Sequence, residues 1–244
     1  MLVEVFLITF ILSAFFSLGG IGSATALIPA MDMLGFGFNF AKAIGLFVNT
    51  ATTITASIMN IKRKVLDFKF AMPLVFSLAI TAPIGAYLSK FIPVEIVKAL
   101  FALFLLFAGS MIFFSKHEVT KETISPVFLF LLGSIAGIIS GLLGLGGGSI
   151  LLPILMILGF DTKKIAITMS FVIPFSTLGA FITYLSFTKM NWLVLSVAAI
   201  AAILGGIVGN YVMHFHLNQK QIKRIIAILM YIIAIKMFYS LTIK

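Results

Sequence analysis

The chain has 244 residues, of which 61% are hydrophobic and only 10% are charged, and its mean hydropathy is +1.23. A soluble domain is nearer half apolar and a quarter charged. The composition therefore excludes a soluble globular protein and predicts a multi-pass protein of the cell (plasma) membrane. The net charge of +10 comes from lysines and arginines between the apolar segments, which indicates loops and lipid headgroup contacts rather than nucleic-acid binding.

Apolar segments separated by short polar gaps follow one another along the whole chain. A transmembrane helix needs about 20 apolar residues, and most of the segments are near that length. Two of them, 3–34 and 126–159, are too long for a single span, and each contains a glycine cluster. We therefore expect an all-α integral membrane protein. The segments cover about residues 3–34, 43–60, 70–90, 94–114, 126–159, 165–186, 192–213 and 221–240.

The two glycine clusters interrupt strongly apolar sequence. The longer one runs from Gly137 to Pro153 as GIISGLLGLGGGSILLP, and a weaker copy runs from Phe16 to Pro29 as FSLGGIGSATALIP. Opening a helix at membrane depth exposes backbone groups, which is tolerated only where protein or a water-filled cavity satisfies them. Two such breaks at corresponding places in two halves of a chain are typical of a transporter binding site.

The two halves of the chain are similar in sequence at an offset of about 124 residues. Pro29 aligns with Pro153, and the Leu-Gly-Phe that begins at Leu34 aligns with the one that begins at Leu158. This similarity indicates an internal duplication. We expect a first transmembrane repeat over 1–114, a cytoplasmic linker over 115–125, and a second transmembrane repeat over 126–244.

The direction of the repeats depends on the two overlong segments. If each spans the membrane once, the repeats are parallel, with four crossings each. If each is a re-entrant hairpin, the repeats are inverted. With Lys62–Lys64 placed in the cytoplasm, the inverted arrangement puts eleven basic residues inside and five outside, whereas the parallel one puts eight on each side. The positive-inside rule therefore favours inverted repeats, each a broken-helix hairpin followed by three transmembrane helices, with both termini outside.

The helices that begin after the glycine clusters are candidates for anion binding. A helix N-terminus offers unpaired N–H groups and positive potential, which suit a small oxyanion. Hydroxyls and amides on the following helices complete the predicted site, and Asn49 is its strongest member because an amide in an apolar segment needs partners. The alternatives are that the glycines only permit close helix packing and that the hydroxyls bond within their own helices. The predicted site comprises Gly20, Gly22, Ser23, Thr25, Asn49, Thr50, Gly146, Gly147, Gly148, Ser149, Ser170 and Ser176.

Charged residues are scarce within the apolar segments. Asp32 is the acidic residue placed well inside one, and we consider it either a carrier of a coupling proton or an interfacial carboxylate near the turn at Gly35. We expect no buried cation. The chain has no cysteine, and the spacing of His214 and His216 does not predict a metal site. No catalytic residues, metal or cofactor are therefore expected, and the chain is not expected to be an enzyme.

The stretch from Gly141 to Pro153 resembles the TauE/SafE sulfite-exporter family of membrane permeases, and Leu18 to Pro29 is similar to a degenerate copy of the same motif. The segment from Lys164 to Ser170 resembles the helix start of that family, with Thr168 and Met169 in place of Gly and Thr. The resemblance covers nearly the whole chain. It implies transport of sulfur-containing anions such as sulfite, sulfonates, sulfoacetate or thiosulfate, with substrate and direction differing among members.

These observations together predict a secondary transporter that moves a small sulfur-containing anion by alternating access. The expected partners are that anion and the lipid bilayer, with a homodimer left open and no nucleic acid. One alternative is an anion channel that uses the same site. Others are a non-transporting membrane subunit or an intramembrane enzyme.

Overall fold

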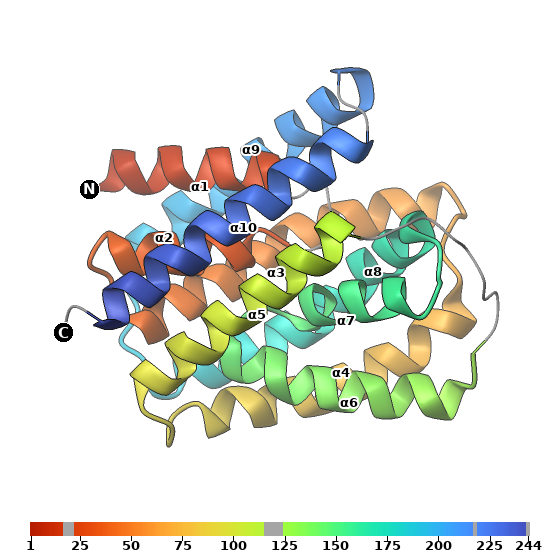
Figure 1. Cartoon of the computed structure of the whole chain (residues 1–244), viewed down its shortest axis with the longest axis horizontal. Helices are drawn as coiled ribbons and strands as arrows, with labels where there is room; N and C mark the ends of the chain where they lie inside the picture. The colour runs from red at the N-terminus through yellow and green to blue at the C-terminus, as the bar shows by residue number, and fades with distance from the viewer. Residues whose placement is uncertain (17–21, 115–123, 217–218, 243–244) are drawn as a thin grey trace.

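A computed structural model describes residues 1–16, 22–114, 124–216 and 219–242, and the regular elements within these ranges are all α-helices (Figure 1). Five of them, α3, α4, α5, α6 and α8, are long and apolar enough to cross a membrane. The predicted all-α membrane fold class is therefore confirmed. The helices are α1 (Leu2–Phe16), α2 (Ala24–Met33), α3 (Phe38–Lys62), α4 (Phe68–Leu88), α5 (Val94–Phe114), α6 (Pro126–Leu143), α7 (Gly147–Ile157), α8 (Thr162–Leu185), α9 (Trp192–His216) and α10 (Gln219–Thr242).

Each overlong segment consists of two helices, α1 with α2 and α6 with α7. In the second segment, α6 packs against α4 and runs in the same direction. Gly133 of α6 lies against Ser77 of α4, and Gly141 lies against the backbone of Ala82 further along both helices. A side chain at either glycine would collide with α4, so these small residues allow the two backbones to approach closely.

The short helix α7 then runs back along α4. Its first residue, Gly147, lies against Leu78, and Phe160, just beyond its end, contacts Phe70 near the start of α4, with ring centroids 5.3 Å apart. Relative to α4, α6 runs in the same direction and the chain from Gly147 to Phe160 runs in the opposite direction. The segment 126–159 is therefore a hairpin and not a single span.

Polar residues at the loops explain where several helices begin. Asp67 accepts a hydrogen bond from the N–H of Phe70 at the start of α4, and Asp161 accepts one from the N–H of Lys164 at the start of α8. Asn191 does the same for α9. A carboxylate or amide oxygen in this position satisfies one of the N–H groups that a helix N-terminus leaves unpaired.

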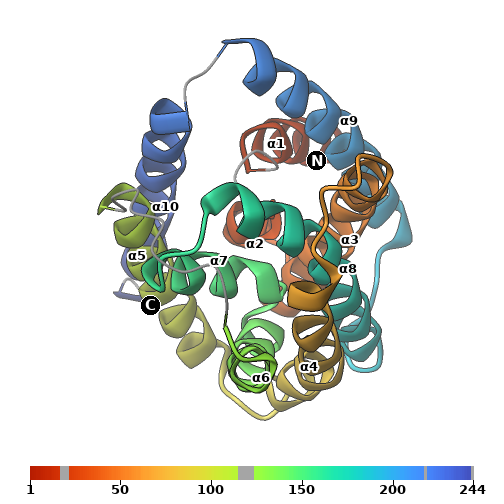
Figure 2. The same cartoon turned by 90° about the vertical axis from the view of Figure 1, so that its right-hand side faces the viewer.

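The two short helices lie in the interior of the molecule. Figure 2, which looks along the long axis, shows α2 near the centre with longer helices around it. All residues from Ala24 to Pro29 are buried, and so are those from Gly147 to Pro153. The longer helices therefore enclose the first turns of both short helices.

Figure 1 shows both termini at one end of the long axis and the α3–α4 loop at the other end. The turn that follows α2 and the turn that follows α7 repeat one another, because Phe36 N–H bonds to Met31 O and Phe160 N–H bonds to Leu155 O. The first of these turns lies at the end of the molecule with the termini and the second at the opposite end (Figure 1). This arrangement is compatible with the predicted inverted repeats.

Candidate functional site

The second helix break consists of Gly144, Leu145 and Gly146. Gly144 and Gly146 both have φ of 78°, a left-handed backbone that favours glycine because it has no Cβ. The N–H groups of Gly144 and Leu145 bond to carbonyls of the last turn of α6, which closes that helix before α7 begins at Gly147. The break is therefore built into the sequence at these two glycines.

The first break ends at Gly22, which also has a left-handed backbone with φ of 86°. Ser23 follows, and α2 begins at Ala24. The hydroxyl of Ser23 is buried and has no hydrogen-bond partner among the described residues. Gly20, which the sequence also placed in the site, lies outside the residues that the structure describes.

Asn49 of α3 joins the two breaks. Its Nδ2 donates a hydrogen bond of 3.2 Å to the carbonyl of Leu145 in the second break. Its amide also fills the space where a side chain on Gly22 would lie, so it touches the first break as well. The residue is fully buried, and its Oδ1 has no hydrogen-bond partner among the described residues. A buried amide with an unused acceptor is costly, so Asn49 is the predicted site residue with the clearest reason to contact a ligand.

Hydroxyl groups from both repeats meet beside these breaks. The Oγ atoms of Thr25 in α2 and Ser149 in α7 lie 3.3 Å apart, and these residues occupy equivalent positions in the two repeats. The hydroxyls of Thr50 in α3 and Thr177 in α8 lie 2.7 Å apart. The first turns of α2 and α7 therefore face each other across the interface between the repeats.

Ser176 also belongs to this group, because its Oγ accepts a hydrogen bond of 3.2 Å from the N–H of Gly147. The interaction satisfies one of the orphan donors at the start of α7. We call Gly22, Ser23, Thr25, Asn49, Thr50, Leu145, Gly146, Gly147, Gly148, Ser149, Ser176 and Thr177 the central cluster. Thr177 was not among the predicted site residues.

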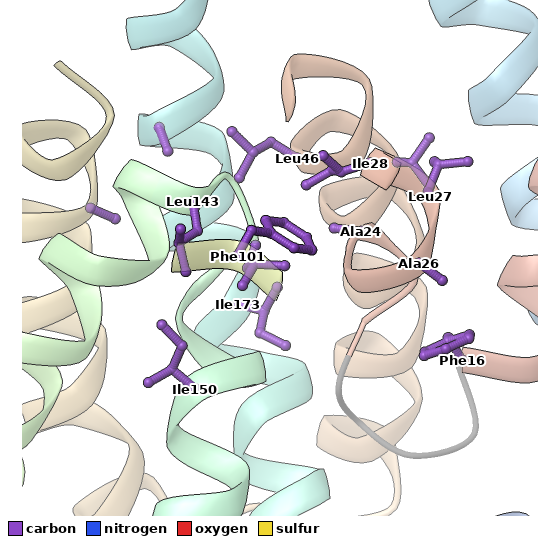
Figure 3. Close-up of a cluster of buried hydrophobic side chains, with 14 of the residues drawn as sticks. Phe16, Ala24, Ala26, Leu27, Ile28, Leu46, Phe101, Leu143, Ile150 and Ile173 are labelled. Atoms are coloured by element: carbon purple, nitrogen blue, oxygen red, sulfur yellow. The ribbon is translucent and has the colours of Figure 1, made fainter. Parts of the chain in front are cut away.

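Apolar side chains cover the start of α7 in this conformation. A Cβ on Gly147 would collide with Leu78, and one on Gly148 would collide with Ile173. Figure 3 shows Ile173 among the apolar side chains around the short helices, together with Phe101 of α5 and Ile150 of α7. The glycines here allow close packing, and Leu78 and Ile173 fill the space beside the first residues of α7.

Ser170 lies outside the central cluster. Its Oγ accepts a hydrogen bond of 2.8 Å from Asn60, and its carbonyl accepts one of 2.5 Å from Ser57. Asn60 follows Asn49 on α3 by eleven residues, which is about 16 Å along a helix. The structure therefore places Ser170 nearer the α3–α4 loop than the other predicted site residues.

Asp32 also lies apart from the breaks, at the end of α2. Its carboxylate is 2.6 Å from the ammonium of Lys98 in α5, and both side chains are about one-fifth exposed. The ion pair gives the carboxylate a local partner near the surface. This geometry favours the interfacial alternative for Asp32 over a role in carrying a coupling proton.

Lys42 of α3 is a buried basic residue, and the expectation that the chain buries none is wrong. The side chain is fully buried. Its Nζ donates a hydrogen bond of 2.6 Å to the Oγ of Ser89 and lies over the rings of Phe38 and Tyr184, 5.2 and 4.9 Å from their centroids. Lys42 precedes Asn49 by seven residues, two turns on the same face of a helix, which is the sequence signal that could have identified it.

A metal site is not apparent in the described parts of the chain, where no three His, Asp or Glu side chains lie close enough to hold an ion. Cysteine is absent from the sequence altogether. The groups brought together at the breaks are instead amide, hydroxyl and backbone groups. Such groups bind small polar or anionic ligands.

Comparison with known proteins identifies related membrane transporters. A family model described as sulfite exporter TauE/SafE matches residues 5–237. A probable membrane transporter protein of Methanocaldococcus jannaschii is 30% identical over 192 residues, which cover 74% of this chain and 71% of that protein.

Two bacterial proteins with the same description match over more of their length. One from Bacillus subtilis is 23% identical over 253 residues (92% of each chain), and one from a Sinorhizobium species is 28% identical over 250 residues (97% of this chain and 92% of that protein). The chain therefore belongs to the TauE/SafE family and is a multi-pass membrane transporter.

Proposed function

We propose that this transporter moves a small sulfur-containing anion by alternating access and binds it between the two helix breaks. The substrate class follows from the family, which is described as a sulfite exporter. Sulfite, sulfonates, sulfoacetate and thiosulfate share small size, negative charge and oxygen acceptors. A helix N-terminus suits such oxyanions, and the first turns of α2 and α7 meet at the contact between Thr25 and Ser149.

The observation that carries the proposal is Asn49, which touches the breaks of both repeats from a fully buried position. Its Nδ2 has two hydrogens, and Leu145 O takes one of them. The second hydrogen and the unpartnered hydroxyl of Ser23 are donors that an oxyanion would use. The free Oδ1 would accept a hydrogen bond from a protonated form such as hydrogensulfite or from a water that accompanies the anion.

The apolar cover over α7 supports alternating access over a permanently open channel. Leu78 and Ile173 occupy the space beside Gly147 and Gly148 in this conformation. An anion reaches the start of α7 only after these side chains move. A site that is closed in one state and open in another is what alternating access requires.

Thermal unfolding of the purified protein tests the proposed site, since a ligand that binds the native state raises its melting temperature. We expect sulfite, thiosulfate or a sulfonate to stabilise the wild type and Asn49→Leu to lose that stabilisation. Asn60→Leu is the matched control, because it makes the same change about 16 Å further along the same helix. An Asn49→Leu protein that folds and keeps the full anion-dependent shift would contradict the assignment.

Flux into proteoliposomes separates transport from the alternatives. We expect uptake of sulfite to saturate with concentration, because an alternating-access site turns over at a limited rate. Flux that rises linearly without saturation would indicate a channel. No flux of any sulfur-containing anion would instead favour a non-transporting subunit.

A further inference from the structure

The ammonium of Lys42 is buried without a carboxylate partner. Among the described residues, no Asp or Glu oxygen lies within ion-pair distance of its Nζ, and the ion pairs present involve Glu4, Asp32 and Asp67 with other cations. An ammonium has three donors, and Ser89 takes one of them. Burying a charge is expensive unless it is paired, and an ionisable side chain within a membrane protein is by default a candidate for function.

Lys42 lies beside the second helix break. An ideal Cβ on Gly144 would be 2.6 Å from the Cβ of Lys42, so the break packs directly on the lysine side chain. Lys42 and Asn49 are two turns apart on one face of α3, about 10 Å along the helix. The ammonium therefore lies between the central cluster and the end of the molecule that carries both termini (Figure 1).

The surroundings of Lys42 carry a surplus of positive charge. Lys98 also lies over the ring of Phe38, with its Nζ 5.3 Å from the centroid, and the carboxylate of Asp32 is taken by Lys98. The hydroxyl of Tyr184 donates to the carbonyls of Gly141 and Leu142 at the end of α6, and the ring of Tyr184 lies beneath the ammonium of Lys42. Two lysines thus lie over Phe38, and the one carboxylate nearby pairs with Lys98 and not with Lys42.

We propose that Lys42 is a second anion-binding position of this transporter, which pairs with the oxyanion as it passes between the central cluster and the end that carries the termini. This inference rests on the proposed function and adds a cationic group to the same route. Oxygen atoms of the anion take the two ammonium donors that Ser89 leaves. The competing explanation is structural: Lys42 only stabilises the carbonyl ends of α4 and α6, where a cation is favourable.

Sulfite titration followed by thermal unfolding tests the proposal on three proteins: the wild type, Lys42→Met and Lys164→Met. Lys164→Met is the matched control, because Lys164 is a partly exposed lysine at the opposite end that is paired with Asp67. We expect Lys42→Met to raise the half-maximal sulfite concentration at least about tenfold, as loss of one partner of a buried charge pair does. The control should stay within about twofold of the wild type.

Each outcome has a distinct meaning. Unchanged sulfite affinity in a folded Lys42→Met protein overturns the inference and favours the structural explanation, while the proposed function stands. A wild-type protein that responds to neither sulfite nor thiosulfate overturns the proposed function and the inference with it.

If Lys42→Met does not fold, sulfite affinity is measured on Ser89→Ala instead. This variant removes only one small hydroxyl, at the end of α4. Without Ser89 the ammonium has a further donor for the anion, so sulfite should bind several-fold more tightly. Sulfite affinity that is unchanged or weaker in Ser89→Ala overturns the inference.

Discussion

The starts of α3 and α8 occupy equivalent places in the two repeats, and each includes a lysine. The two lysines, Lys42 and Lys164, differ in exposure and in the groups that they contact. Lys164 is 38% exposed and its ammonium is 3.1 Å from the carboxylate of Asp67, which is 41% exposed. Lys42 is fully buried and bonds only to a serine and two aromatic faces. A hydrated ion pair costs little to form, whereas a buried ammonium without a carboxylate is expensive.

The backbone conformation before α3 resembles that before α8, whereas the burial and the partners of Lys42 and Lys164 differ. Similar turns precede both helices, with Gly35 and Gly159 in left-handed conformations, yet of the lysines whose burial the structure describes only Lys42 is fully buried. This difference indicates that the two ends of the proposed anion route are not equivalent. The clearest expected difference between the two ends is the side of the membrane that each one faces.

Cysteine labelling assigns the two ends of the molecule to the two sides of the membrane. The chain contains no cysteine, so Arg63→Cys at the α3–α4 loop and Lys90→Cys at the α4–α5 loop provide single labels. The charge distribution predicts that a membrane-impermeant maleimide labels residue 90 in intact cells and residue 63 only after permeabilisation. The reverse pattern would place Lys42 at the cytoplasmic end, and labelling of both residues from outside would contradict an arrangement with two opposite ends.

Alanine substitution at two glycines measures how tightly the break packs on Lys42. Gly144 and Gly35 both have left-handed backbones, which costs an alanine about 1–2 kcal/mol. Gly35 has open space around its Cβ position, whereas Gly144 faces Lys42, which adds about 1–3 kcal/mol of overpacking. Gly144→Ala should therefore lower the free energy of unfolding more than Gly35→Ala. Equal losses would mean that Lys42 moves aside freely.

Removal of the two lysine charges should have opposite effects on stability when no anion is present. Lys42→Met removes a buried ammonium that has no carboxylate partner, and because burying such a group is costly, the change should leave stability unchanged or raise it. Lys164→Met removes a partly exposed pair and should cost less than about 1 kcal/mol. Melting temperatures of the two variants provide the comparison. A clear loss of stability in Lys42→Met would support the structural role of that lysine at the ends of α4 and α6.

Asp32→Asn tests the ion pair at the Lys42 end of the molecule. The variant removes the partner of Lys98, and because the pair is about one-fifth exposed, we expect a loss of roughly 1 kcal/mol. Transport driven by a pH gradient should persist if the carboxylate serves only this pair. Loss of gradient-driven transport with intact anion exchange would instead identify Asp32 as a carrier of the coupling proton.

Acid should slightly lower the free energy of unfolding, because protonation of Asp67 removes its ion pair with Lys164. The hydrogen bond from the Lys164 side chain holds the pKa of Asp67 below its usual range. Because the folded pKa is the lower one, the stabilisation is present above the unfolded pKa of about 4 and is lost as pH falls through the folded value. Asp67→Asn should be less stable than the wild type at pH 7, by under about 1 kcal/mol, and the difference should disappear in acid. A difference that persists there would contradict this account.

The fold was predictable because its signals are local. Long apolar runs specify membrane helices, and glycines at positions such as Gly144 and Gly146 specify where a run is broken. The segment 126–159 is too long for a single span and contains a glycine cluster, which favoured the hairpin that α6 and α7 form over one broken span. The hairpin follows from the hydropathy and length of the segment itself.

The site was predictable only in part. Asn49 stood out as an amide in apolar sequence, but its contact with Leu145 joins residues 96 apart and depends on how the repeats pack. Ser170 is one turn and a half from Ser176 on the same helix, yet it contacts Asn60 instead of the breaks. The position of Ser170 and Ser176 along their apolar segment does not predict which of them lies at the breaks. That depends on which part of α3 packs opposite each serine.

By itself the sequence determined that this chain is a helical membrane protein with two glycine clusters in overlong apolar segments, since backbone hydrogen bonding in lipid leaves few other solutions. Only the tertiary structure decided which polar side chains meet at those breaks and which lysine is buried. Lys42 and Lys164 both lie near a helix start, and the spacing between Lys42 and Asn49 does not show which groups surround either lysine. Their environments differ because Ser89, Tyr184 and Gly144 enclose Lys42, whereas Asp67 meets Lys164 near the surface.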